Sequence, residues 1–226
     1  MTPSPQSKNQ QQDQPGQPGQ GQPQPPAQAA SPRLHGLPPV VDAHTRLLIL
    51  GSFPGARSLA EQRYYAHPHN QFWRLLQMNL ANPAPSQTPS IAPSTEPLNE
   101  PSIRPSHAAP HEPPTDYATR LQRLHGWGVG LWDVYASCLR AGSLDSAIRE
   151  PQLNDFVALA RSLPHLAGIA FNGGESWKHH RLVQAQLDLP MWRLPSSSPA
   201  HASWTVQRKA EAWRAVLVQA GLVAGP

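Results

Sequence analysis

The chain has 226 residues and a formal net charge of +4, with 18 lysines and arginines against 14 aspartates and glutamates. No run approaches the roughly 20 apolar residues of a membrane span, and no apolar signal-peptide core is present. The single cysteine, Cys138, excludes an internal disulfide and a four-cysteine metal site. We therefore expect a protein of the reducing cytoplasm, whose small positive charge is compatible with a polyanionic partner.

Two segments are too low in complexity to build a core. Residues 1–36 are dominated by Gln, Pro, Gly and Ser, so we predict a disordered tail there. A Pro- and Ser-rich stretch at about 79–116 indicates a loop insertion. The remaining residues, about 150, suffice for one hydrophobic core. We predict a single domain over 37–226 that carries this insertion.

Four short apolar runs predict buried strands, at 46–50, 129–134, 166–171 and 190–194. The segments between and after them have helical spacing of apolar residues, at 72–80, 116–125, 151–163, 175–187 and 203–220. In the third of these, Pro151 suits the first helical position. The alternation predicts a three-layer α/β/α sandwich with a central, mainly parallel four-stranded sheet.

Polar or glycine-rich motifs follow three of the predicted strands, at 51–70, 172–175 and 195–201. Because the carboxyl ends of parallel strands share one edge of the sheet, we expect these motifs to meet in one cleft. Aromatic and amide side chains at such a place suit a flat, hydrogen-bonding ligand such as a nucleobase.

In these motifs the chain resembles the uracil-DNA glycosylase superfamily, most closely its hypoxanthine-DNA glycosylase family. The resemblance covers about 40–78 and 117–220. It rests on Gly-Ser-Phe-Pro-Gly at 51–55, Tyr-Tyr-Ala-His-Pro at 64–68, Asn-x-Phe-Trp at 70–73, Leu-Trp-Asp-Val at 131–134, Ser-Leu-Asp at 143–145 and Leu-Pro-Ser-Ser-Ser-Pro-Ala at 194–200. It implies a uracil-DNA glycosylase-like fold, duplex DNA with a deaminated base as partner, and no cofactor or metal.

One departure from related mismatch-specific enzymes moves the expected catalytic residue. Those enzymes resemble this chain but carry a water-positioning Asn where Phe53 stands. The resemblance to the hypoxanthine family implies that Asn70 orients the attacking water instead. The alternative is that Asn70 only caps the helix that begins near Phe72. A second departure is His201, where the family pattern has Asn.

The expected base-binding residues are Gly51, Ser52, Phe53, Tyr65 and Asn172. Tyr65 offers a stacking face for an extruded base, unless it is an ordinary packing aromatic. The Asn172 amide can donate to O6 and accept from N1–H of hypoxanthine, a pattern that adenine reverses. The alternative for Asn172 is a cap on the following helix. Backbone N–H groups of the 51–55 turn would stabilise the leaving base.

The expected DNA-contacting residues are His67, Ser196, Ser197, Ser198, Pro199, Ala200 and His201. The serine hydroxyls suit phosphates, which position DNA without reading its sequence. Pro199 and Ala200 would form a small apolar wedge in the gap left by the base. The alternative is a plain serine-rich loop.

The function that these residues predict is hydrolytic excision of hypoxanthine from DNA. Of three lysines, Lys8 lies in the tail, while Lys178 and Lys209 lie on predicted helices. A lyase would need a lysine amine for a Schiff base, so we predict a monofunctional enzyme that leaves an abasic site. We also expect a monomer. The alternatives are a uracil/thymine-mismatch glycosylase and a non-catalytic module that binds damaged DNA.

Overall fold

The structure is a computed structural model that describes residue 1, residues 32–81 and residues 116–225. Its central sheet has four parallel strands in the spatial order β3-β2-β6-β7. These strands are β2 (Leu47–Gly51), β3 (Val129–Asp133), β6 (Gly168–Asn172) and β7 (Met191–Leu194). They coincide with the four apolar runs of the sequence, so the predicted parallel sheet is confirmed.

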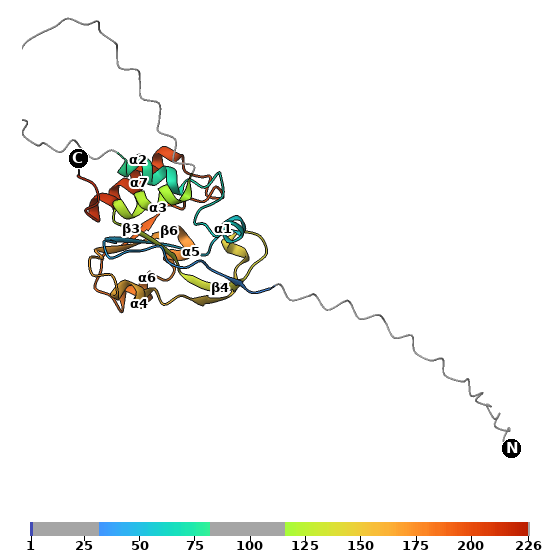
Figure 1. The fold of residues 1–226 in the computed structure, drawn as a ribbon. Coiled ribbons are helices and arrows are strands. Elements are labelled where there is room, and N and C mark those ends of the chain that lie inside the picture. The colour runs from blue at the N-terminus through green and yellow to red at the C-terminus, as the bar shows by residue number, and fades with distance from the viewer. Residues whose placement is uncertain (2–31, 82–115, 226) are drawn as a thin grey trace, which may run out of the picture. The chain divides into compact units, whose positions relative to one another are not determined.

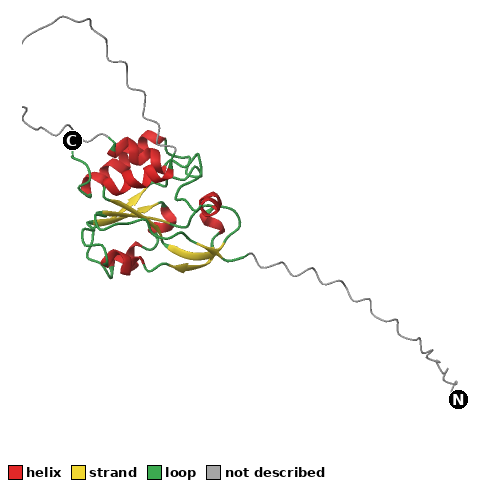
Figure 2. Ribbon diagram, in the orientation of Figure 1, coloured by secondary structure: helices red, strands yellow, loops and turns green. Residues whose placement is uncertain are grey.

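Helices cover both faces of this sheet (Figures 1 and 2). One face carries α2 (Phe72–Leu80), α3 (Tyr117–Gly126) and α7 (Val206–Gln219), and the other carries α4 (Phe156–Arg161) and α6 (His180–Gln184). Successive side chains of a strand point to opposite faces. Leu47 and Ile49 accordingly join the core under α2 and α7, whereas Leu48 and Leu50 join the core under α4 and α6. The predicted three-layer sandwich is confirmed.

A second sheet of three antiparallel strands was not predicted from the sequence. It consists of β1 (Leu34–His35), β4 (Tyr135–Leu139) and β5 (Arg149–Leu153), in the order β1-β4-β5. The strand β1 lies within the range 1–36 that the sequence predicts to be disordered, so that prediction is wrong for residues 34 and 35, while residues 2–31 lie outside the described ranges. The strand is held in place because Leu34 and His35 pair with Cys138 and Ser137 of β4.

The predicted helix at 151–163 was wrong in its first half. Pro151 lies in β5, whose five residues are all exposed, and the helix α4 begins only at Phe156. The start is fixed by Asp155, whose Oδ1 accepts a hydrogen bond of 2.9 Å from the backbone N–H of Ala158.

The predicted helix at 175–187 is divided into α5 (Gly174–Trp177) and α6, with His179 as the N-cap residue of α6. A further helix, α1 (Ala56–Glu61), and a 3₁₀ turn, η1 (Asp145–Ala147), follow β2 and β4. Most of the predicted insertion at about 79–116 lies outside the described residues. No described helix is long and apolar enough to cross a membrane.

Candidate active site

A cleft of about 480 Å³ opens at the carboxyl ends of the parallel strands. Residues 51–55 line it after β2, Asp133 at the end of β3, Asn172 at the end of β6, and residues 196–201 after β7. This edge is where open α/β sheets bind ligands. The cleft brings together every site residue predicted from the sequence, namely Gly51, Ser52, Phe53, Tyr65, His67, Asn70, Asn172, Ser196, Ser197, Ser198, Pro199, Ala200 and His201.

The floor of the cleft is built around Gly51. Gly51 and Asp133 are register partners on β2 and β3. A methyl group on Gly51 would overlap Asp133 Oδ1 and would lie 3.4 Å from the Tyr65 hydroxyl oxygen. Because glycine has no Cβ, a carboxyl and a phenol can gather over the end of the strand.

Asp133 is the residue of the floor to which sequence reasoning gave no role. Its side chain is 4% exposed, and no described residue bonds to its Oδ2 atom. Burial raises the pKa of Asp133 to about 7, because water no longer solvates the charged form. The carboxyl group therefore holds a proton at mildly acid pH and can donate a hydrogen bond. The signal in the sequence was an acidic residue at the end of a buried strand.

Asn172 is held differently from what the sequence predicts. Its Nδ2 group donates to the Tyr65 hydroxyl at 3.2 Å and to Ser197 Oγ at 2.9 Å, so both amide protons are used. Its Oδ1 atom accepts from the backbone N–H of Ser197 at 3.0 Å, which leaves one lone pair. Asn172 can thus accept a hydrogen bond from a base, while a donor to the base must come from another residue. The alternative role as a helix cap is not seen, since α5 has no side-chain cap.

Tyr65 stands beside Asn172 with its ring stacked on Phe72. The two ring centroids are 3.8 Å apart and the planes differ by 7°. The backbone of Tyr65 has φ of +53°, a left-handed conformation that is uncommon for an aromatic residue. Since Phe72 covers one face of the ring, the opposite face is the one on which a base would stack. Tyr64, by contrast, is buried in the core and donates from its hydroxyl group to the carbonyl oxygen of Leu37.

Phe53 forms a wall of the cleft and is itself fixed by a buried arginine. The Arg140 guanidinium carbon lies 4.9 Å from the centre of the Phe53 ring, and the guanidinium donates to the carbonyl oxygen of Pro54. Phe53 is 6% exposed and packs into the core under α4. Its ring therefore shapes the cleft and cannot replace an amide at this position.

Asn70 lies at the mouth of the cleft, in the loop before α2. Its Oδ1 atom accepts from the backbone N–H of Phe72 at 3.0 Å, which supports the start of the helix. Gln71 holds this loop in place: its N–H donates to the carbonyl oxygen of Ser197 at 3.0 Å, and its Oε1 accepts from Lys209 Nζ at 3.0 Å. The N-cap residue of α2 is Gln71 rather than Asn70, and α2 has no side-chain cap, so the capping alternative is not seen as such. The Asn70 side chain lines the cleft.

The serine-rich segment at 196–201 is less uniform than its sequence. Ser197 is 1% exposed and its hydroxyl and N–H both bond to Asn172, so it positions Asn172 and cannot reach a phosphate. The Ser196 and Ser198 hydroxyl oxygens accept from backbone N–H groups two residues ahead. Pro199 and Ala200 are exposed at the mouth.

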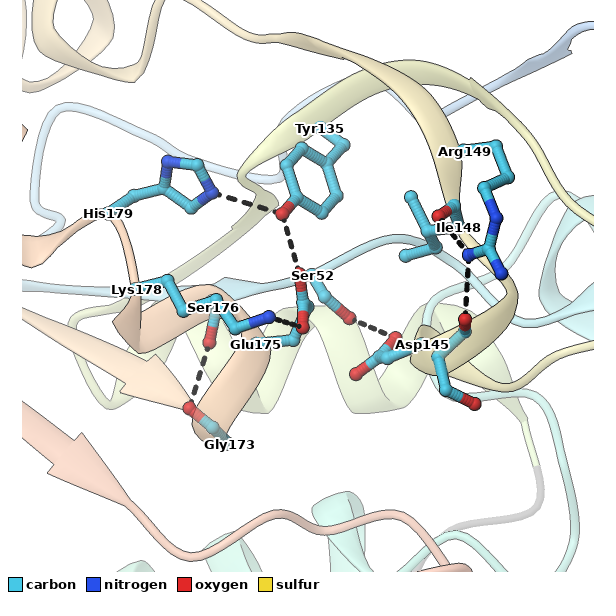
Figure 3. A network of polar contacts seen from close by, with 11 residues as sticks. Ser52, Tyr135, Asp145, Ile148, Arg149, Gly173, Glu175, Ser176, Lys178 and His179 are labelled. Carbon is cyan, nitrogen blue, oxygen red and sulfur yellow. Dashed lines mark hydrogen bonds and ion pairs between the residues drawn. The ribbon is translucent and has the colours of Figure 1, made fainter.

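A polar network surrounds the turn at Ser52 (Figure 3). Ser52 Oγ donates to Asp145 Oδ1 at 2.7 Å, which joins the turn after β2 to the first residue of η1. Beside it, the Tyr135 hydroxyl donates to Glu175 Oε1 at 2.8 Å and lies 3.0 Å from His179 Nε2. These contacts fasten the start of α5, directly after Asn172, to the second sheet.

Comparison with known proteins decides the family. The model of the uracil DNA glycosylase superfamily matches residues 38–219. The chain belongs to this superfamily. It is 33% identical over 181 residues to a protein from Methanosarcina acetivorans named hypoxanthine DNA glycosylase, across 80% of this chain and 96% of that protein. A protein of the same name from Methanosarcina barkeri is 32% identical over 153 residues, across 68% of this chain and 79% of that protein.

A solved structure supports the same fold. A solution NMR structure of a candidate uracil DNA glycosylase from Methanosarcina acetivorans superposes with a TM-score of 0.63 at 30% identity, covering 84% of this chain and 99% of that one. The superfamily that was recognised from the motifs at 51–55 and 194–200 is therefore confirmed.

A superfamily member must hold DNA, and a second groove of about 520 Å³ adjoins the cleft. His67 and Asn70 line both hollows. The groove is basic, because Arg63, Arg74 and Arg120 line it while its one carboxylate, Glu61, pairs with Arg57 at 2.6 Å. Arginines of this kind suit a phosphate backbone.

The described lysines lie away from the cleft of this glycosylase-superfamily protein. Lys178 is paired with Glu175 at 2.6 Å, and Lys209 is buried and bonded to Gln71. Neither lines the cleft. Within the described ranges, no group of three or more His, Cys, Asp or Glu side chains is placed to hold a metal ion.

Proposed function

We propose that this protein excises hypoxanthine from DNA by hydrolysis and leaves an abasic site. The observation that carries the proposal is a pair of groups that line the cleft at the strand ends: Asn172 with only an acceptor to offer, and Asp133 with a proton to donate. The names of the two Methanosarcina relatives support the same substrate. The partner is duplex DNA with a deaminated base, bound by a cytoplasmic monomer that associates with the nucleoid.

The pair fits the edge of hypoxanthine. Asn172 Oδ1 accepts from N1–H, and the protonated Asp133 donates to O6. Adenine presents an acceptor at N1 and a donor at its amino group. The lone pair of adenine N1 would then face the lone pair of Asn172 Oδ1 in a buried site, where neither could be hydrogen-bonded. Guanine shares O6 and N1–H and differs by its amino group at C2, so the shape of the cleft must exclude it.

The reaction itself requires little nucleophilic power. The C1′–N9 bond breaks with its electron pair on the base, a water oxygen bonds to C1′, and the proton that the water loses ends on the base, which leaves as neutral hypoxanthine. Because the sugar develops oxocarbenium character, a positioned water is sufficient. Asn70 orients this water, while Asp133 and the backbone N–H groups after Gly51 stabilise charge on the departing base. Tyr65 stacks on the base through the face opposite Phe72.

The test is an excision assay with labelled duplexes that contain hypoxanthine, xanthine, uracil, guanine or adenine. After alkali treatment, strand breaks are expected with hypoxanthine. Breaks chiefly with uracil would instead establish the uracil/thymine alternative, and tight binding without breaks would establish the non-catalytic module. Borohydride should trap no covalent adduct, because no described lysine lines the cleft.

The variant Asn70→Ala should lose turnover by on the order of 10²-fold or more while DNA affinity changes little. Gln122→Ala, an exposed amide on α3 outside both hollows, is the matched control. Full activity of Asn70→Ala would mean that another residue orients the water.

A further inference from the structure

A large apolar side chain stands exposed at the mouth of the cleft. Leu144 is 58% exposed and lines the cleft between Ser143 and Asp145. The other exposed large apolar side chains of the described residues are Met1, Met78, Leu153 and Leu182, and none of these lines the cleft or the basic groove. Among the described residues, Leu144 is thus the one exposed large apolar side chain that borders either hollow.

The residues on either side of Leu144 are tied to the turn after β2. Ser143 Oγ accepts from the backbone N–H of Ala56 at 2.9 Å, and Asp145 Oδ1 accepts from Ser52 Oγ at 2.7 Å. Figure 3 shows the second of these bonds in the network around Ser52. The two bonds fix the backbone on both sides of Leu144 to the wall of the cleft. The leucine is therefore held at the mouth by its neighbours and buries little of its own surface.

The following turn is braced as well. The Arg149 guanidinium donates to the carbonyl oxygen of Ile148 at 2.8 Å (Figure 3). It also donates to the carbonyl oxygen of Ser146 at 2.8 Å. The backbone N–H of Ala147 donates to the carbonyl oxygen of Leu144 at 3.1 Å. A braced loop can push an apolar group against a base stack, because the loop does not yield.

From these contacts we propose that Leu144 is the wedge that enters the DNA duplex and fills the space left by the extruded nucleotide. This inference rests on the proposed function. An apolar wedge between base steps offsets part of the cost of unstacking and keeps the flipped base from returning. The sequence assigned this task to Pro199 and Ala200. Ala200 exposes only a methyl group, and the isobutyl group of Leu144 covers more of a base pair.

The experiment compares Leu144→Ala with Leu153→Ala, a control at an exposed leucine on β5 outside both hollows. Single-turnover rates are measured on hypoxanthine in a duplex and in a single strand. The duplex rate of Leu144→Ala should fall by roughly tenfold or more, from the apolar surface that is no longer buried. The single-strand rate should stay unchanged, because no stack has to be opened. Leu144→Met should restore most of the duplex rate.

An equal loss of rate on both substrates, or no loss of rate on the duplex, would contradict the proposal that Leu144 is the wedge. Fluorescence of 2-aminopurine placed beside the lesion gives a second reading of extrusion that does not depend on catalysis. If the unchanged protein cuts neither substrate, the proposed function fails. The proposal that Leu144 is the wedge is then supported if Leu144→Ala lowers the fluorescence change on binding and Leu153→Ala does not, and it is contradicted if the two variants behave alike.

Discussion

The floor and the mouth of the cleft are built by different means. In the floor, Gly51 and Asp133 are placed by the register of two parallel strands and are buried against one another. At the mouth, Leu144 and Ala200 are exposed. Asp145, beside Leu144, bonds to Ser52 on another segment, whereas the N–H of Ala200 bonds to Ser198 within its own loop. The groups that we propose to read the base are therefore attached to the ends of the sheet, and the groups that we propose to contact DNA lie in loops outside it.

The largest expected effect is on stability, at Asp133. Because the folded state holds this proton up to about pH 7 and the unfolded state loses it near pH 4, the free energy of unfolding falls as pH rises between them. Asp133→Asn removes this dependence. Relative to the unchanged protein, the variant should gain about 3 kcal/mol between pH 5 and pH 8, measured by urea unfolding. An equal difference at both pH values would show that the carboxyl titrates normally and is not part of a dry floor.

The variant Gly51→Ala tests how tightly the floor is built. The new methyl group would overlap Asp133 Oδ1, so the carboxyl or the strand must move. We expect the single-turnover rate to fall by on the order of 10²-fold on duplex and single strand alike, since the damage is to base binding. In Gly126→Ala, the matched control, the added methyl group meets nothing within 4 Å. A loss of rate confined to the duplex would mean that Gly51 affects the opening of the duplex rather than the binding of the base.

The smallest expected effect belongs to the basic groove beside the mouth. Arg74→Gln should weaken duplex binding by a few-fold and lower the slope of log affinity against log salt by about 1, if one phosphate contact is lost. Arg161→Gln on α4, outside both hollows, is the control. In Arg74→Gln the affinity for duplex should fall, whereas the rate at saturating enzyme should stay unchanged. A fall in the rate at saturating enzyme would show that the basic groove also affects base binding or catalysis in the cleft.

The parallel sheet and the gathering of the site were predictable from the sequence, because apolar runs mark buried strands and strand ends share an edge. The second sheet was not. All residues of β5 are exposed and Pro151 resembles a helix start, while pairing with β4 is non-local and interrupted by register shifts. The sequence also could not predict that both amide protons of Asn172 are already hydrogen-bonded within the protein. Ser197 lies 25 residues away in the chain, and only the fold shows that it occupies the amide.

The Ser197 hydrogen bonds have a consequence for energetic coupling. Through its side chain and N–H, Ser197 holds Asn172, and through its carbonyl oxygen it holds Gln71, the neighbour of Asn70. The proposed recognition of the base and the proposed orientation of the water thus share one intermediary residue. Their contributions to the activation free energy should then be non-additive, so that a base that displaces Asn172 also misplaces the water. Selectivity would be exerted twice, once in binding and once in the rate of bond cleavage.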